Sequence, residues 1–184
     1  AAWLRGKDIT CHCPLLPGHG NLPYMIHGYH RRQWVAEAEE ALASLRQWAE
    51  QIFIVGHSMG AVLAAQLIKK NPDIYGLIML APLYDVPDWR IKLSGLVQRF
   101  MPFFYPLKRK DVDREVFLGR VVDFDPTIDV DDPDLQEWLI EASRIPLSGV
   151  AQMLQMARLG RKLWPKLQIP ALILQGGKDP AVSP

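Results

Sequence analysis

The stretch Ile52-Phe53-Ile54-Val55-Gly56-His57-Ser58-Met59-Gly60 decides the fold of this chain. Its first four residues form an apolar, β-branched run that is typical of a strand buried on both faces. Residues 61–70 read as a helix, which ends at Asn71-Pro72 because proline cannot continue a helix. The pattern G-x-S-x-G between a buried strand and a helix indicates a nucleophile elbow, a turn so sharp that small residues must flank the serine.

Ser58 is the candidate nucleophile in this turn. The turn lifts the serine hydroxyl clear of the sheet, and the N-terminus of the following helix favours negative charge on a reacting oxygen. G-x-S-x-G alone arises often by chance. The strand before it and the helix after it favour a nucleophile over a plain glycine-rich turn.

Length and composition agree with a soluble enzyme of one main domain. The chain has 184 residues, of which 49% are hydrophobic and 22% charged, so it can bury a sizeable core. A formal net charge of only +1 gives no electrostatic reason to expect nucleic acid or an anionic membrane surface as a partner. The sequence contains no apolar run of membrane-spanning length and opens on no signal peptide.

Cys11 and Cys13 flank His12 in a predicted first strand, residues 8–14. Alternation puts both thiols on one face and the imidazole on the other, so these side chains cannot converge on a zinc ion, and no second ligand cluster follows. We expect the cysteines to act as small hydrophobic residues of a core strand. Two cysteines on one strand are also poorly placed to pair, and the lack of a disulfide framework favours a reducing compartment, the cytoplasm.

Strands and helices alternate along much of the chain. We expect strands at residues 8–14, 52–55, 77–80 and 172–175, and a helix over residues 33–49 with apolar side chains at helical spacing. This alternation predicts an α/β fold with a parallel sheet covered by helices on both faces. Ligands of such sheets bind beyond the carboxyl ends of the strands, where Ser58 is expected.

The alternation breaks between residues 85 and 166, where prolines recur and two stretches, 135–142 and 150–157, have apolar residues at helical spacing. We expect a mostly helical cap inserted over the strand ends, between core segments 1–84 and 167–184. An aromatic run at residues 100–105 can line an acyl pocket or serve as the core of the cap. Phe103 and Phe104 are the candidate substrate-binding residues of this run.

The chain resembles α/β-hydrolases of the carboxylesterase and monoacylglycerol-lipase group. Four passages, in the order and spacing of that family, carry the resemblance: Thr10–Pro14 running into Pro17-Gly18-His19-Gly20; Gly56–Gly60; Leu80–Leu83; and Ile169–Leu172 running into Gly176–Pro180. The elbow is shared by the whole superfamily. The loop P-x-x-P-G-H-G is narrower and points to esterases and lipases.

The resemblance implies roles for single residues. Ser58 is the nucleophile, the backbone N–H of Met59 is one oxyanion-hole donor, and Asp179, in the loop after the last strand, is the triad acid. A carboxylate there can orient an imidazole and stabilise its charged form. Asp85 is the rival, because it also follows a core strand and some relatives place the acid there. From sequence alone, Asp179 can also be a plain turn residue.

The catalytic histidine implied by the resemblance has no counterpart in the sequence. The order Ser, Asp, His puts this base after Asp179, yet all five histidines precede Ser58. We expect His57 to pack beside the elbow and His19 to shape its loop. In the family, the second oxyanion donor follows a strand that would precede Ala1. The sequence begins without methionine and stops soon after a predicted strand, so we interpret it as a fragment, inactive alone, of a longer enzyme.

The implied reaction of that parent is hydrolysis of a small to medium acyl ester or a monoacylglycerol through an acyl-enzyme on Ser58, without a metal or organic cofactor. The expected partner is this small-molecule ester, with no nucleic acid and no integral membrane segment. The same triad also serves thioesterases, peptidases and acyltransferases. A non-catalytic binding protein of the same fold is the alternative from another class, and the intact Ser58 and Asp179 argue against it.

Overall fold

A three-stranded parallel sheet forms the centre of the computed structural model, which describes residues 4, 6–7, 9–20, 22–85, 89–110, 113–115, 118 and 127–179. Its strands are β1 (Phe53–His57), β2 (Gly76–Leu80) and β5 (Ala171–Leu174), in the spatial order β1-β2-β5. Both strand pairs are parallel. The predictions of strands at 52–55, 77–80 and 172–175 are therefore confirmed, with ends shifted by one or two residues.

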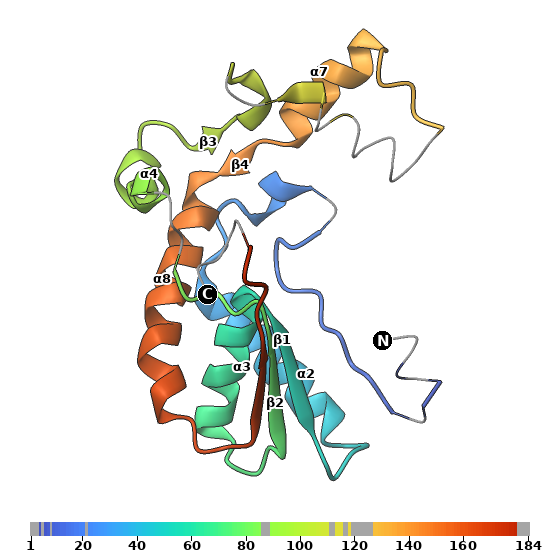
Figure 1. Cartoon of the computed structure of the whole chain (residues 1–184), viewed down its shortest axis with the longest axis vertical. Helices are drawn as coiled ribbons and strands as arrows, with labels where there is room; N and C mark the ends of the chain where they lie inside the picture. The colour runs from blue at the N-terminus through green and yellow to red at the C-terminus, as the bar shows by residue number, and fades with distance from the viewer. Residues whose placement is uncertain are drawn as a thin grey trace.

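Three long helices accompany this sheet: the one that connects β1 to β2 packs on both of these strands, and the other two pack on that helix (Figure 1). Helix α2 (Arg31–Leu45) precedes β1, α3 (Met59–Lys70) connects β1 to β2, and α8 (Leu147–Leu163) precedes β5. His30 caps α2, because its ring accepts a hydrogen bond from the Arg32 N–H while Gln33 bonds back to the His30 N–H. Helix α3 is buried on most of its surface, since the sheet lies on one side of it and α8 on another.

Two apolar clusters form the core. The first lies between the sheet, α2 and α3, and includes Leu42, Ala64, Ile74, Leu77 and Met79. The second joins α3 to α8 near the carboxyl ends of the strands, and includes Trp34, Val62, Leu63, Leu83, Leu154 and Met156. The second cluster therefore lies next to the turn between β1 and α3, where Met59 packs against it.

The two faces of the sheet differ in the described part of the chain. Phe53, Val55 and His57 alternate along β1 on an exposed face, and every residue of β5 is also exposed. The prediction of helices over both faces is thus met on one face only among these residues. No helix in the described ranges is both long and apolar enough to span a lipid bilayer.

The predicted strand at residues 8–14 is wrong for residues 9–14, which form no strand, and Asp8 lies outside the described residues. A strand is stabilised by hydrogen bonds to a neighbouring strand. Among the described strands β1 pairs only with β2, and residues 9–14 lie apart from the sheet (Figure 1). Cys11 and Cys13 are consequently exposed free thiols and not core residues.

Short elements lie beyond the carboxyl ends of the strands (Figure 1). They are η1 (Pro23–Ile26), α4 (Trp89–Lys92), α5 (Ser94–Val97), η2 (Pro106–Lys108), α7 (Pro133–Ala142), and an antiparallel pair of β3 (Phe103–Phe104) with β4 (Ile145–Pro146). The helical spacing at 135–142 and 150–157 is confirmed by α7 and α8. The β3–β4 pair was not predicted, because two residues per strand leave no alternation to detect.

Contacts between these short elements are partly ionic. Lys108 Nζ donates to Glu141 Oε1 at 2.8 Å, which links η2 to α7. This hydrogen bond raises the pKa of Lys108 and lowers the pKa of Glu141.

Helix α8 also falls within the range predicted for the cap, but it packs along α3. The boundaries of the cap remain a prediction, and η3 (Trp164–Lys166) leads from α8 towards β5.

Candidate active site

Ser58 is the single residue between the end of β1 and the start of α3. Its backbone has φ 50° and ψ −117°, a conformation that costs a non-glycine residue about 1–3 kcal/mol and persists only where the surroundings hold it. The Ser58 N–H donates to the carbonyl of Leu80 at 2.9 Å, and the Ser58 carbonyl accepts from the N–H groups of Ala61 at 3.1 Å and Leu83 at 3.2 Å. The serine hydroxyl makes no capping hydrogen bond to α3.

The two glycines of the motif have different roles. A Cβ atom on Gly56 would lie 2.5 Å from the Cα of Ala61, so the close approach of α3 to β1 requires glycine there. A Cβ atom on Gly60 would meet no atom within 4 Å. The expectation that small residues must flank the serine therefore holds at Gly56, whereas at Gly60 the described structure leaves open space.

Met59 begins α3, and its backbone N–H is one of the first-turn donors that have no acceptor within the helix. The positive end of the helix dipole lies at the same place. The Met59 side chain packs against the second core cluster, and this contact holds the start of the helix in place. This N–H beside Ser58 can donate to negative charge that develops on a reacting oxygen.

Asp179 lies half-buried in the loop after β5. Its N–H donates to the carbonyl of Gly176 at 3.2 Å, and its Oδ2 accepts from Gln175 Nε2 at 3.3 Å. Because β1, β2 and β5 are parallel neighbours, the strands that lead to Ser58 and to Asp179 end at the same edge of the sheet, two strands and thus roughly 10 Å apart. An imidazole with a hydrogen bond at each nitrogen bridges roughly 8 Å, so the spacing suits a triad.

Asp85 follows β2 and has two cationic neighbours. Its Oδ2 lies 3.1 Å from Lys92 Nζ of α4, and its Oδ1 lies 3.4 Å from a guanidinium nitrogen of Arg161 of α8. The carboxylate of the rival triad acid thus joins the loop after β2 to two helices.

Three of the histidines have structural surroundings that differ from those of a catalytic base. His19 packs its ring edge against Trp34, with 5.3 Å between the ring centroids, so the structure agrees with a role in shaping its loop. His30 caps α2. His57 lies on the exposed face of β1, and the prediction that it packs beside the elbow is wrong, because strand alternation directs it away from the core.

Phe103 and Phe104 are both half-buried in β3. The Phe103 ring lies 4.8 Å from the ring of His27 and 5.3 Å from the Arg144 guanidinium, and the Phe104 ring lies 5.9 Å from that of Arg109. These contacts bring the two rings together with the β3–β4 pair and the loop after η1. They include no described contact with Ser58.

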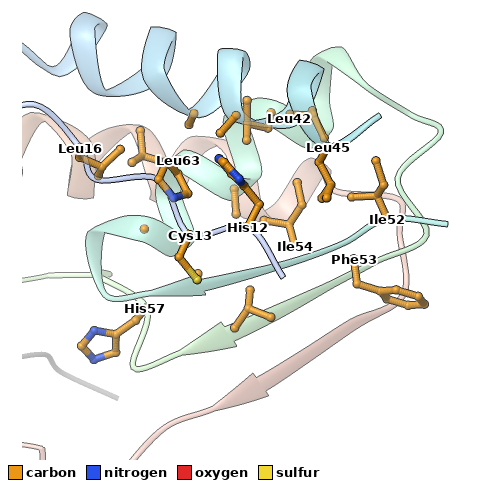
Figure 2. A pocket seen from close by; sticks show the side chains of 18 residues that line it. His12, Cys13, Leu16, Leu42, Leu45, Ile52, Phe53, Ile54, His57 and Leu63 are labelled. Carbon is orange, nitrogen blue, oxygen red and sulfur yellow. The ribbon is translucent and has the colours of Figure 1, made fainter. Parts of the chain in front are cut away.

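An apolar cavity of about 330 Å³ lies beside the elbow and was not predicted from the sequence (Figure 2). Its lining residues come from the segment 12–16, α2, β1 and α3, and the polar ones are His12, Cys13 and His57, of which His57 points its ring away from the cavity (Figure 2). Both Gly56 and Gly60 line it. The open space at Gly60 is therefore part of a cavity along the edge of β1 that has no strand partner among the described residues.

Two backbone groups that hold Ser58 in place could not be identified from the sequence. The sequence marks the passage Leu80–Leu83 only as part of a family resemblance, whereas the structure shows the Leu80 carbonyl and the Leu83 N–H bonded to Ser58. Since every residue type except proline offers the same backbone groups, side-chain identity gives no signal for such roles.

Comparisons with known proteins give one family and several relatives. A family model described as serine aminopeptidase, S33, matches residues 1–184. A thermostable monoacylglycerol lipase from Bacillus sp. (strain H-257) is 29% identical over 186 residues, which cover 100% of this chain and 64% of the lipase. A monoglyceride lipase homologue from monkeypox virus is 27% identical over 128 residues, covering 68% of this chain and 43% of the relative. The chain thus spans less than two thirds of either relative.

Solved structures share the arrangement of strands and helices. A structure reported with the metagenome-derived lipolytic enzymes LipS and LipT has a TM-score of 0.66 at 17% identity, covering 92% of this chain and 61% of that one. A soluble variant of monoglyceride lipase from Saccharomyces cerevisiae, in complex with a substrate analogue, has a TM-score of 0.51 at 16% identity, covering 85% and 54%. At these identities the likeness concerns the fold, and that fold is the predicted one.

Proposed function

This chain belongs to the α/β-hydrolase family described as serine aminopeptidase, S33, and we propose that it supplies the nucleophile, one oxyanion donor and the triad acid of a carboxylic ester hydrolase. The observation that carries the proposal is the backbone of Ser58, held at positive φ between β1 and α3 with a hydroxyl that does not cap the helix. The relatives named as monoacylglycerol and monoglyceride lipases support an ester as the substrate.

The proposed chemistry is acyl transfer to water in two steps. The Ser58 Oγ attacks the ester carbonyl carbon, its proton passes to a histidine, and the N–H of Met59 donates to the oxyanion. The histidine then gives this proton to the leaving alcohol, which departs as the acyl-enzyme forms. Water attacks the acyl-enzyme, its proton passes through the histidine back to Ser58, and the carboxylic acid leaves.

We assign the triad acid to Asp179. Its position two strands from Ser58 leaves room for an imidazole, whereas the Asp85 carboxylate is paired with Lys92 and Arg161. His19, His30 and His57 have surroundings unlike those of a catalytic base, and the triad order puts the base after Asp179. We therefore place the base, and the second oxyanion donor, on further residues of the whole protein, and we expect the 184 residues alone to be inactive.

The substrate class can be tested with matched leaving groups. We expect the whole protein to hydrolyse p-nitrophenyl esters and monoacylglycerols, and to leave alanine p-nitroanilide and acyl-coenzyme A thioesters largely intact. Kinetics with the four substrates, followed by absorbance or by release of fatty acid, measure the preference as kcat/KM. Faster release of p-nitroaniline than of p-nitrophenol would assign a peptidase instead, and binding without turnover of any substrate would assign a binding protein.

We further propose that the cap, with Phe103 and Phe104, selects the acyl chain. Burial of one methylene contributes about 0.8 kcal/mol, or about fourfold in kcat/KM, so the preferred chain length depends on the lining of the pocket. Phe103→Ala or Phe104→Ala should shift the preference among p-nitrophenyl esters and leave the rate on the shortest ester nearly unchanged.

Phe100→Ala is the matched control for these two changes, because the Phe100 side chain is 87% exposed. This variant should keep the chain-length preference of the unmodified protein. Equal losses on short and long esters in the Phe103 and Phe104 variants would show that the two rings stabilise the fold and do not choose the substrate.

A further inference from the structure

The end of β2 and the loop that follows it bond to the backbone of Ser58 at two points. The Leu80 carbonyl accepts from the Ser58 N–H at 2.9 Å, and the Leu83 N–H donates to the Ser58 carbonyl at 3.2 Å. Between them Ala81 has a positive φ of 41°, and its N–H donates to the carbonyl of Leu174 in β5 at 2.8 Å. A non-glycine residue keeps such a backbone only where its surroundings fix it, so the shape of this loop and the position of Ser58 depend on each other.

Arg161, near the end of α8, contacts the two residues that come directly after Leu83. Its guanidinium donates to the backbone carbonyl of Tyr84 and lies 3.4 Å from Asp85 Oδ1. It also lies 5.8 Å from the centroid of the Tyr84 ring. One planar cation therefore holds a carbonyl, a carboxylate and an aromatic ring of the same loop, an arrangement that suits arginine better than lysine.

Further contacts fix Arg161, Tyr84 and Asp85, which we call the anchor, to the core. The Tyr84 ring stacks on that of Trp164 at 5.8 Å, and Asp85 Oδ2 lies 3.1 Å from Lys92 Nζ. The side chain of Leu83 is 2% exposed, in the cluster that joins α3 to α8. Because α8 packs along α3, and α3 begins immediately after Ser58, the anchor and the nucleophile share one packed unit.

We propose that Arg161 is a positioning residue for the nucleophile: it holds the loop after β2 so that the Leu83 N–H keeps Ser58 in its reactive backbone conformation. This inference rests on the proposed function of Ser58. It also gives Asp85 a role other than that of triad acid, as the second attachment point of the Arg161 guanidinium.

Loss of this anchor should reduce turnover more than substrate binding. A displacement of a reacting group by about 1 Å can cost about 100-fold in rate, so we expect Arg161→Ala to lower kcat by about 10- to 100-fold. The KM for a short ester should change little, because the contacts of Arg161 shown here are with the loop after β2. Arg161→Lys should recover part of the loss, since it keeps the charge beside Asp85 but not the planar fork.

The experiment compares Arg161→Ala, Arg161→Lys and Arg158→Ala in the whole protein. Arg158 is an exposed residue on the same helix, so its replacement removes the same charge without releasing the loop. Two quantities are measured: kcat and KM on p-nitrophenyl acetate, and hydrogen exchange of the backbone amides in residues 80–85. The exchange measurement reports on the Leu83 N–H whether or not the protein hydrolyses esters.

A fall in kcat at constant KM, with faster exchange confined to residues 80–85 in the Arg161 variants alone, supports the inference. Unchanged kcat and exchange in Arg161→Ala overturn it, as does faster exchange over the whole molecule, which indicates a stability effect only. If Arg161→Ala does not fold, Arg161→Lys decides in the same way. An unmodified protein whose Ser58 is unreactive refutes the proposed function instead, and the exchange then still decides whether Arg161 holds the loop.

Discussion

Ser58→Ala in the whole protein is expected to abolish ester hydrolysis and labelling by a fluorophosphonate probe together. Both need a nucleophilic oxygen at the turn between β1 and α3, and the variant keeps every backbone hydrogen bond that holds this turn. Loss of the serine in a well-studied serine protease costs about 10⁶ in turnover, and a residual activity remains from the oxyanion hole and binding. A loss of this order, with an unchanged melting temperature, is the expected result.

Ser94→Ala is a matched control for that experiment. The Ser94 hydroxyl is buried and makes no hydrogen bond within the described part of the chain, so its removal leaves no polar group unpaired. The control should keep full activity and full labelling, without loss of stability. Labelling that persists at its original intensity in Ser58→Ala would place the reactive serine elsewhere and remove the basis for the proposed mechanism.

The elbow could be predicted from sequence because its determinants are local. An apolar run, a glycine that no larger residue can replace and a helix start lie within a few residues of one another, and each restricts the same few backbone angles. The alternation of strands and helices also predicted the parallel sheet. The observed strand order puts Ser58 and the loop that carries Asp179 at the same edge of that sheet.

The failures concern features that depend on distant parts of the chain. Residues 9–14 have the composition of a strand, but a strand needs hydrogen bonds to a neighbour, and this segment pairs with none of the described strands. Arg161 is one of several basic residues on α8, and it meets Asp85 across 76 residues of sequence. Neither the lack of a strand partner at residues 9–14 nor the contact between Arg161 and Asp85 leaves a pattern in the local sequence. Only the packed structure identifies them.

The second large effect is expected at Asp179. Asp179→Asn should reduce kcat by up to about 10⁴, because the amide no longer sets the tautomer of the catalytic histidine or stabilises its charged form. Asp85→Asn should cost no more than about tenfold, since the asparagine oxygen still accepts a hydrogen bond from Arg161 and only the charge is lost. Steady-state kinetics on a p-nitrophenyl ester measure both losses.

These two substitutions control for each other. Each replaces a carboxylate that follows a core strand with an amide of the same size, so a general effect of charge or folding should be similar in both. The proposed geometry separates them, because Asp179 follows a strand two places from β1, with room for an imidazole beside Ser58, while Lys92 and Arg161 hold Asp85 on the helices. A greater loss for Asp85→Asn would move the triad acid to the loop after β2, and Arg161 would then act on the triad itself.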